Sequence, residues 1–323
     1  MSLFFRSLAV ILFALPALLW VACSPTSQPP LRVATNVWSG YETLYLARSL
    51  GLYDPAHIRL VEMTSAGEVS YALRNSTVEA GALTLDEALS LMQDGMDLRV
   101  VLVMDVSHGA DALLARDDIE QLQDLRGKRV GVETGAVGAM MLDAALQAGR
   151  LRATDIKMVP LPPNALLAAW RDGRVDAVVT FNPLRTQLLA QGAHSLFDSS
   201  QIPGRIIDVL VVRGDVFDSR PGVLKELLLG YFAALAHLQQ NPQDAATRMA
   251  PRLGVTPEQV PLQFSGLELP GLQENRNWLS GPAPAIKAVA ADLGSVMLQR
   301  HLLRHPVNID RLAAPDFLPE APQ

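Results

Sequence analysis

Polar, aromatic and glycine residues that could bind a small molecule lie where predicted strands pass into loops or helices. Trp38 is the strongest candidate, because an indole on such a loop can stack on an apolar or cationic ligand and donate a hydrogen bond. The alternative is that Trp38 fills the hydrophobic core. Asn36 and Tyr41 flank Trp38, and Gly40 allows close approach of the backbone.

Acidic side chains are prominent among the other candidates. Asp86, Asp105, Asp111 and Glu133 lie at predicted crossings or helix starts, and Asp208 lies on a return crossing. Each carboxylate alone could instead cap a helix or pair with arginine. Together they favour a cationic, zwitterionic or heterocyclic ligand over a bare anion such as nitrate. An anion site calls for basic residues, and the nearby candidates are His108, Arg185 and Arg205.

Helix starts supply the remaining candidates. Ser39, Ser65 and Thr84 are each followed three residues later by glutamate, which predicts capping boxes. Thr84 ends a strand and precedes Asp86, so we expect it to contact ligand as well. Asn182 precedes a proline, as an N-cap does.

A glycine-rich loop that contains Gly135 follows a strand and opens another helix. It matches neither of the common nucleotide-binding patterns. Its backbone N–H groups and the helix dipole suit a small polar ligand.

No catalytic residue, metal site or cofactor is predicted. The chain lacks a G-x-S-x-G elbow, and a hydrolase built on Asp105 and Asp111 is a weaker alternative. His301 and His305 are four apart, but Arg300 and Arg304 beside them indicate a solvated basic face.

Strand-length apolar runs alternate with helical patterns from Leu31 to Val212, and helices alone are expected after it. The runs are nearly continuous in Val, Ile, Leu and Ala, which is typical of strands buried on both faces of a parallel sheet. This order predicts an α/β fold. The net charge of −6 and the scattered basic residues predict no nucleic-acid binding.

The N-terminus reads as an export segment. Residues 1–23 combine one arginine, an apolar run and small residues before Cys23, the sole cysteine. The run is too short for a comfortable membrane span. Cys23 resembles the lipidated cysteine of a bacterial lipobox, although Trp20 stands where leucine is usual; the alternative is ordinary cleavage nearby. Residues 24–30 read as a tether.

The chain resembles the nitrate/sulfonate/taurine class of substrate-binding proteins, which serve ABC importers and are related to thiamine-pyrimidine-precursor binding proteins. The resemblance is carried, in the order the family uses, by Trp38-Ser-Gly-Tyr-Glu-Thr-Leu-Tyr-Leu-Ala47, Gly51-Leu-Tyr53, Gly81-Ala-Leu-Thr84, Asp105-Val-Ser-His-Gly-Ala-Asp111, Leu125-Arg-Gly-Lys-Arg-Val-Gly-Val-Glu133 and Gly173-Arg-Val-Asp-Ala-Val-Val-Thr180. The family often has glutamate where this chain has Asn182.

This resemblance implies a type II periplasmic-binding-protein fold with two α/β lobes, a ligand cleft between them and two hinge crossings. The first lobe would comprise residues 31–111 and 214–323, and the second residues 112–213. A monomer tethered by lipid on the periplasmic side of a bacterial membrane would then pass a small-molecule solute to ABC permease subunits. The alternatives are a tethered ligand sensor for a signalling partner and a pyrimidine-synthase-like enzyme.

Overall fold

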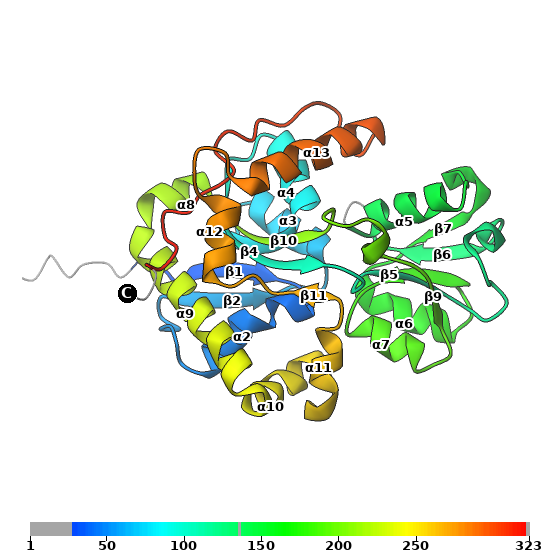
Figure 1. The fold of residues 1–323 in the computed structure, drawn as a ribbon, viewed down its shortest axis with the longest axis horizontal. Helices are drawn as coiled ribbons and strands as arrows, with labels where there is room; N and C mark the ends of the chain where they lie inside the picture. Colours follow the sequence, from blue (N-terminus) through cyan, green and yellow to red (C-terminus); the bar gives the residue numbers. More distant parts are fainter. Residues whose placement is uncertain (1–27, 135–136, 321–323) are drawn as a thin grey trace, which may run out of the picture. The chain divides into compact units, whose positions relative to one another are not determined.

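The apolar runs of the sequence build two mixed β-sheets in the computed structural model, which describes residues 28–134 and 137–320 (Figure 1). The predicted signal segment, Cys23, most of the tether and Gly135 lie outside these residues. The six-stranded sheet has the order β11-β4-β10-β3-β1-β2, and the five-stranded sheet has the order β7-β6-β8-β5-β9. We call each sheet with its helices the six-stranded half and the five-stranded half.

The strands of the six-stranded sheet are β1 (Leu31–Thr35), β2 (Ile58–Glu62), β3 (Ala80–Thr84), β4 (Leu98–Ser107), β10 (Ile207–Arg213) and β11 (Leu267–Glu268). Those of the five-stranded sheet are β5 (Ala112–Ala115), β6 (Arg129–Val132), β7 (Lys157–Pro160), β8 (Ala177–Thr180) and β9 (His194–Asp198). The chain passes to the five-stranded half between β4 and β5. It returns between β9 and β10.

Helices cover both faces of the six-stranded sheet (Figure 1). One face packs on α2 (Glu42–Ser49), α8 (Gly214–Ser219), α9 (Pro221–Gln240) and α10 (Pro242–Leu253). The other packs on α3 (Ala66–Arg74), α4 (Leu85–Gln93), α12 (Leu272–Leu279) and α13 (Ala285–Gln299). A short helix, α11 (Val260–Gln263), precedes β11.

In the five-stranded half, α5 (Val137–Ala148) covers one face, and α6 (Pro163–Arg171) and α7 (Leu184–Leu189) cover the other. Short 3-10 turns are η2 (Ser39–Tyr41), η3 (Leu122–Leu125), η4 (Ala153–Asp155), η5 (Ser199–Gln201) and η6 (Pro257–Gln259). The buried cluster that includes α3, α4 and α13 continues through α5, so one apolar core spans both halves.

The sheets are mixed, so the expectation of parallel sheets is wrong in part. Strand β10 is antiparallel to both β3 and β4, and β5 is antiparallel to both β8 and β9. All four residues of β5 and the first six of β10 are buried. A continuous apolar run therefore reports burial on both faces, whatever the direction of the neighbouring strands.

Two strands were missed in the sequence. Strand β9 is a partly exposed edge strand that contains His194, Ser195 and Asp198, so it has no continuous apolar run. Strand β11 has two residues and lies after Val212, where only helices were expected.

Two local predictions about helix starts are wrong. Ser39 lies within η2 and makes no capping bond, because Glu42 instead pairs with Arg252. Helix α7 begins at Leu184 rather than directly after Asn182. Ser65 caps α3 as predicted, with its Oγ accepting from the Glu68 N–H at 3.2 Å.

No helix in residues 28–134 and 137–320 is both long and apolar enough to cross a bilayer.

Candidate ligand-binding site

Three neighbouring strands place polar side chains in a row. In the sheet register, Asp208 of β10 lies opposite Thr84 of β3 on one side and opposite Asp105 of β4 on the other. All three side chains are buried. Because β10 enters the sheet only after the chain has built the five-stranded half, Asp208 meets residues more than a hundred positions before it.

The loop after β1 covers this row with two aromatic donors. The Trp38 Nε1–H donates to Asp105 Oδ2 at 3.0 Å, and the Tyr41 hydroxyl donates to Asp208 Oδ1. The Trp38 side chain is 4% exposed and packs in the core of the six-stranded half. Core packing thus accounts for much of the position of Trp38. Its indole N–H already donates to a carboxylate of the protein. A ligand contact from Trp38 stays a prediction.

Gly40 is required by this same arrangement. A Cβ atom at Gly40 would lie 1.7 Å from Asp105 Oδ2 and 2.7 Å from Trp38 Nε1. The close approach predicted for this glycine is therefore made to the Asp105 carboxylate.

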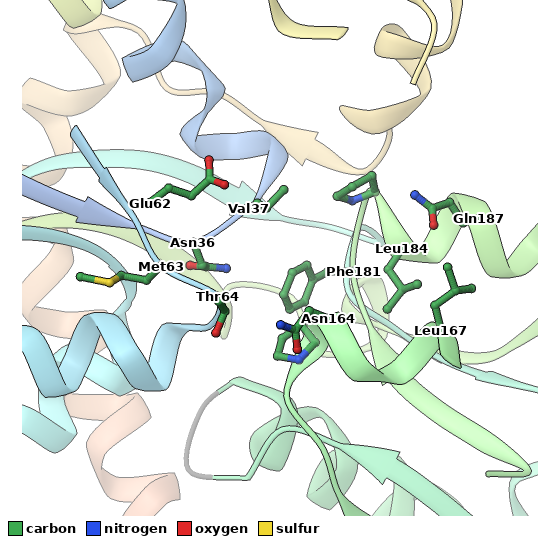
Figure 2. Close-up of a pocket in the computed structure, with 12 residues that line it drawn as sticks. Asn36, Val37, Glu62, Met63, Thr64, Asn164, Leu167, Phe181, Leu184 and Gln187 are labelled. Atoms are coloured by element: carbon green, nitrogen blue, oxygen red, sulfur yellow. The ribbon is translucent and has the colours of Figure 1, made fainter. Parts of the chain in front are cut away.

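An outer cavity of about 400 Å3 lies between the two halves (Figure 2). The six-stranded half contributes Asn36, Val37, Glu62, Met63 and Thr64, and the five-stranded half contributes Pro163, Asn164, Leu167, Phe181, Pro183, Leu184 and Gln187. Most of this lining is apolar, which is usual for small-molecule sites.

A second, inner cavity of about 20 Å3 lies next to it and is strongly acidic. Asn36 and Phe181 line both cavities, so the two adjoin. The other lining residues of the inner cavity are Trp38, Tyr41, Ala66, Thr84, Glu87, Asp111, Glu133, Val137 and Asp208. The structure thus brings most of the predicted site residues to one place.

Hydrogen bonds join the two halves around the inner cavity. Glu133 Oε1 accepts from the Gly67 N–H, and Glu87 Oε1 accepts from the Val137 N–H, both at 3.3 Å. Asn182 donates from Nδ2 to the Gln263 carbonyl at 3.2 Å. Glu133 and Asn182 therefore hold the halves together in this structure, and Asn182 lines neither cavity.

Burial without a cationic partner raises the pKa values of the acids. Burial raises the pKa of Asp111 and of Asp86 to about 6, that of Asp105 to about 7 and that of Glu87 to about 8. Burial, and next the Asp105 charge, raise the pKa of Asp208 well above its usual range. The Asp105–Asp208 pair therefore retains a shared proton near neutral pH.

Several buried acceptors around the inner cavity have no hydrogen-bond partner among the described residues. They are Asn36 Oδ1, Thr84 Oγ1, Asp86 Oδ1, Asp105 Oδ1, Asp111 Oδ2 and Asp208 Oδ2. A shared proton accounts for the facing Asp105 and Asp208 oxygens. Buried polar atoms are normally hydrogen-bonded, so the other oxygens indicate a place for a donor.

Apart from Asn36, the residues that line the outer cavity were missed in the sequence, and three missed residues have a defined role in the site. Phe181 meets Trp38 edge to face at 5.3 Å across the two halves. Glu87 was read only as a helix-capping residue, and its Oε2 does accept from the Thr84 N–H at 3.0 Å. The sequence positions of both residues could have indicated a place in the site, since Phe181 ends a predicted strand and Glu87 follows Asp86.

Arg252 is the third missed residue. It donates to the Asn36 carbonyl at 3.2 Å and to Glu62 at 2.7 Å, pairs with Glu42, and stacks 3.5 Å from the Tyr45 ring centre. It holds the loop that carries Asn36. No sequence signal joins it to that loop, which lies more than two hundred residues away.

Within the described residues, no group of three or more His, Cys, Asp or Glu side chains is arranged to hold a metal ion.

Comparison with known proteins places the chain among solute-binding proteins. A model of the NMT1-like family matches residues 24–254. The chain belongs to the NMT1-like family. The taurine-binding periplasmic protein of Escherichia coli K12 is 26% identical over 227 residues, which span 68% of this chain and 71% of that protein.

Solved structures of other proteins are similar in fold to this chain. The alkanesulfonate-binding protein SsuA from Xanthomonas axonopodis pv. citri bound to MOPS has a TM-score of 0.71 at 19% identity, over 89% of this chain and 98% of that chain. The desulfurization enzyme DszB has a TM-score of 0.64 at 20% identity, over 89% and 97%.

These findings confirm the predicted family and the periplasmic-binding-protein fold, and the taurine-binding and alkanesulfonate-binding relatives are themselves solute-binding proteins. The lobe boundaries and the ligand contacts stay predictions.

Proposed function

We propose that this NMT1-like protein captures a small organic molecule in the cavities between its two halves and delivers it to an ABC importer on the periplasmic side of a bacterial membrane. The observation that carries the proposal is that both halves contribute to one site. The loop after β1 and the segments after β2 and β8 meet around adjoining cavities of about 400 and 20 Å3. A ligand bound there would favour the closed arrangement that a permease recognises.

A binding role is better supported than catalysis. Of the described residues, those that line the two cavities include no histidine, cysteine or lysine, the side chains most often used as base or nucleophile. Among the lining carboxyl groups, Glu87 and Glu133 accept hydrogen bonds across the two halves, and Asp208 accepts from Tyr41. DszB is an enzyme with a similar fold, so the fold alone does not distinguish a binding protein from an enzyme.

The membrane tether is part of the proposal. Cys23 would be lipidated after cleavage of residues 1–22, and the protein would act as a monomer. A Cys23→Ser variant would then appear in the soluble periplasmic fraction, while the parent protein stays with membranes and incorporates labelled palmitate. Membrane retention of the variant would count against the tether.

A thermal-shift screen of protein without residues 1–30 tests the function. The panel would hold sulfonates (taurine, MOPS), primary amines, pyrimidines and nitrate. A ligand at about a hundred times its Kd stabilises the folded state by about 2.7 kcal/mol, a readily measured shift.

A matched pair of variants tests whether the ligand binds in the outer cavity. Leu184→Trp fills the outer cavity and should abolish the shift, whereas Leu229→Trp changes an exposed position on α9 and should leave it intact. The proposal fails if no class of solute gives a shift, or if Leu184→Trp binds as the parent does.

A further inference from the structure

We infer that the inner cavity holds the ammonium group of a primary amine and that the apolar body of the same molecule occupies the outer cavity. The inference rests on the proposed function, because it names the substrate class of that site. It predicts that the site binds a cationic group rather than an anion.

The sizes of the two cavities suit such a molecule. A volume of about 20 Å3 accommodates about one water molecule, and a primary ammonium group is of similar size. A trimethylammonium or sulfonate group is several times larger. Asn36 and Phe181 line both cavities, so a chain can lead from the inner to the outer one.

The hydrogen-bond acceptors of the inner cavity also match the donors of a primary ammonium group. A primary ammonium group has three N–H donors and no acceptor. Asn36 Oδ1, Thr84 Oγ1 and Asp111 Oδ2 line the inner cavity, lack partners among the described residues and belong to side chains less than a tenth exposed. Two of the three are neutral, so the match does not depend on acidic residues alone.

The charges favour a cation. Glu87, Asp111, Glu133 and Asp208 line the inner cavity, and none of the described residues lining either cavity is basic. Arg185 of α7 acts on Asp111 through its charge, but it is not among the residues that line the cavity. A sulfonate or nitrate placed here would face carboxyl groups without a counter-charge.

The outer cavity complements an apolar body. Its lining includes Val37, Met63, Leu167, Phe181 and Leu184. Its only acid, Glu62, is held by Arg252 at 2.7 Å. This cavity therefore contacts the apolar body of the ligand and does not require a second charged group on it.

Binding of an ammonium group should release protons. The titratable groups around the inner cavity are Tyr41, Asp86, Glu87, Asp105, Asp111, Glu133 and Asp208, with Arg185 nearby. Burial raises the pKa of Asp111 to about 6 and that of Glu87 to about 8, so these carboxyls carry protons in part near neutral pH. A bound cation lowers these pKa values and expels the protons.

The test is calorimetric titration of the parent protein with three probes that share one chain: hexylamine, hexane-1-sulfonate and hexyltrimethylammonium. Hexylamine should bind at least about tenfold more tightly than the other two, since only its head forms three hydrogen bonds in the inner cavity. Its affinity should rise from about pH 6 to about pH 8, by up to about tenfold per pH unit for each proton released. Titrations in buffers of different ionisation enthalpy count those protons.

Two variants make the test specific to the cavity. Asp111→Asn keeps the side-chain shape and should weaken hexylamine by about tenfold or more, the loss of one hydrogen bond to a charged group. Asp292→Asn removes an exposed charge on α13 and should leave the affinity unchanged. Equal affinity in parent and Asp111→Asn would overturn the inference, as would net proton uptake on binding.

The outcomes separate this inference from the proposed function. If taurine or hexane-1-sulfonate binds and hexylamine does not, the ammonium assignment is overturned and the solute-binding role stands. If neither these probes nor the wider panel binds, both fail. Tighter binding of hexyltrimethylammonium than of hexylamine overturns the size argument and with it the inference.

Discussion

Replacement of Asp105 by asparagine should stabilise the ligand-free protein at alkaline pH but not at acidic pH. Asp105 is fully buried, accepts the Trp38 N–H and faces Asp208 across the β4–β10 pair. Asparagine keeps an acceptor for Trp38 and offers a donor to Asp208. The substitution therefore removes a titrating group while it retains the hydrogen bonds.

The magnitude follows from the pKa of the buried carboxyl. Burial raises the pKa of Asp105 from 3.8 to about 7. The folded state thus binds a proton more tightly than the unfolded state, so Asp105 stabilises the fold at acidic pH and this stability is lost as pH rises through about 7. Between about pH 5 and about pH 8 the loss attributable to Asp105 is about 2–3 kcal/mol, because one pKa unit is equivalent to about 1.4 kcal/mol.

Urea unfolding of the parent and of Asp105→Asn across this pH range measures the effect. The free energy of unfolding of the variant, relative to the parent, should rise by about 2–3 kcal/mol from about pH 5 to about pH 8. Acids that do not interact with Asp105 titrate equally in both proteins and cancel in the difference. The Asp105 charge raises the pKa of Asp208 in the parent, so its removal in the variant changes the difference in the same direction. Asp292→Asn, at an exposed position, should run parallel to the parent. Parallel curves for Asp105→Asn would refute the reasoning.

Three further substitutions test the packing around the site, each by urea unfolding. Trp38→Ala should cost about 3–5 kcal/mol even without ligand, because a buried indole and its bond to Asp105 are lost; an unchanged midpoint would show that Trp38 is not part of the core. Gly40→Ala should cost about 1–3 kcal/mol, and less in an Asp105→Ala background, since its Cβ would meet that carboxylate; equal costs in both backgrounds would contradict the clash. Arg252→Met should cost about 3 kcal/mol at about pH 8 and less at about pH 5, because burial raises the pKa of Glu42 to about 7 even beside Arg252, so the unpaired carboxyl takes up a proton in acid. An equal cost at both pH values would argue against that pair.

Local patterns predicted most elements because they depend on neighbouring residues. Strands and helices alternate over most of the chain from β1 to α7, as the sequence predicts. Apolar run length, capping residues and proline positions act within a few residues of one another. Strand β9 lacked these patterns because it is a half-polar edge strand.

The sequence by itself determined the fold class, the family and most residue types of the site, since Trp38, Thr84 and the acids stand at strand ends or crossings. Only the tertiary structure decided their partners. The antiparallel β10 sets Asp208 between Thr84 and Asp105, Arg252 reaches back to the Asn36 loop, and Phe181 closes on Trp38 from the other half. The physical reason is that strand direction and interlobe contact join residues far apart in the chain. The same packing buries the acids away from counter-charges, and that burial underlies the proposed ammonium site.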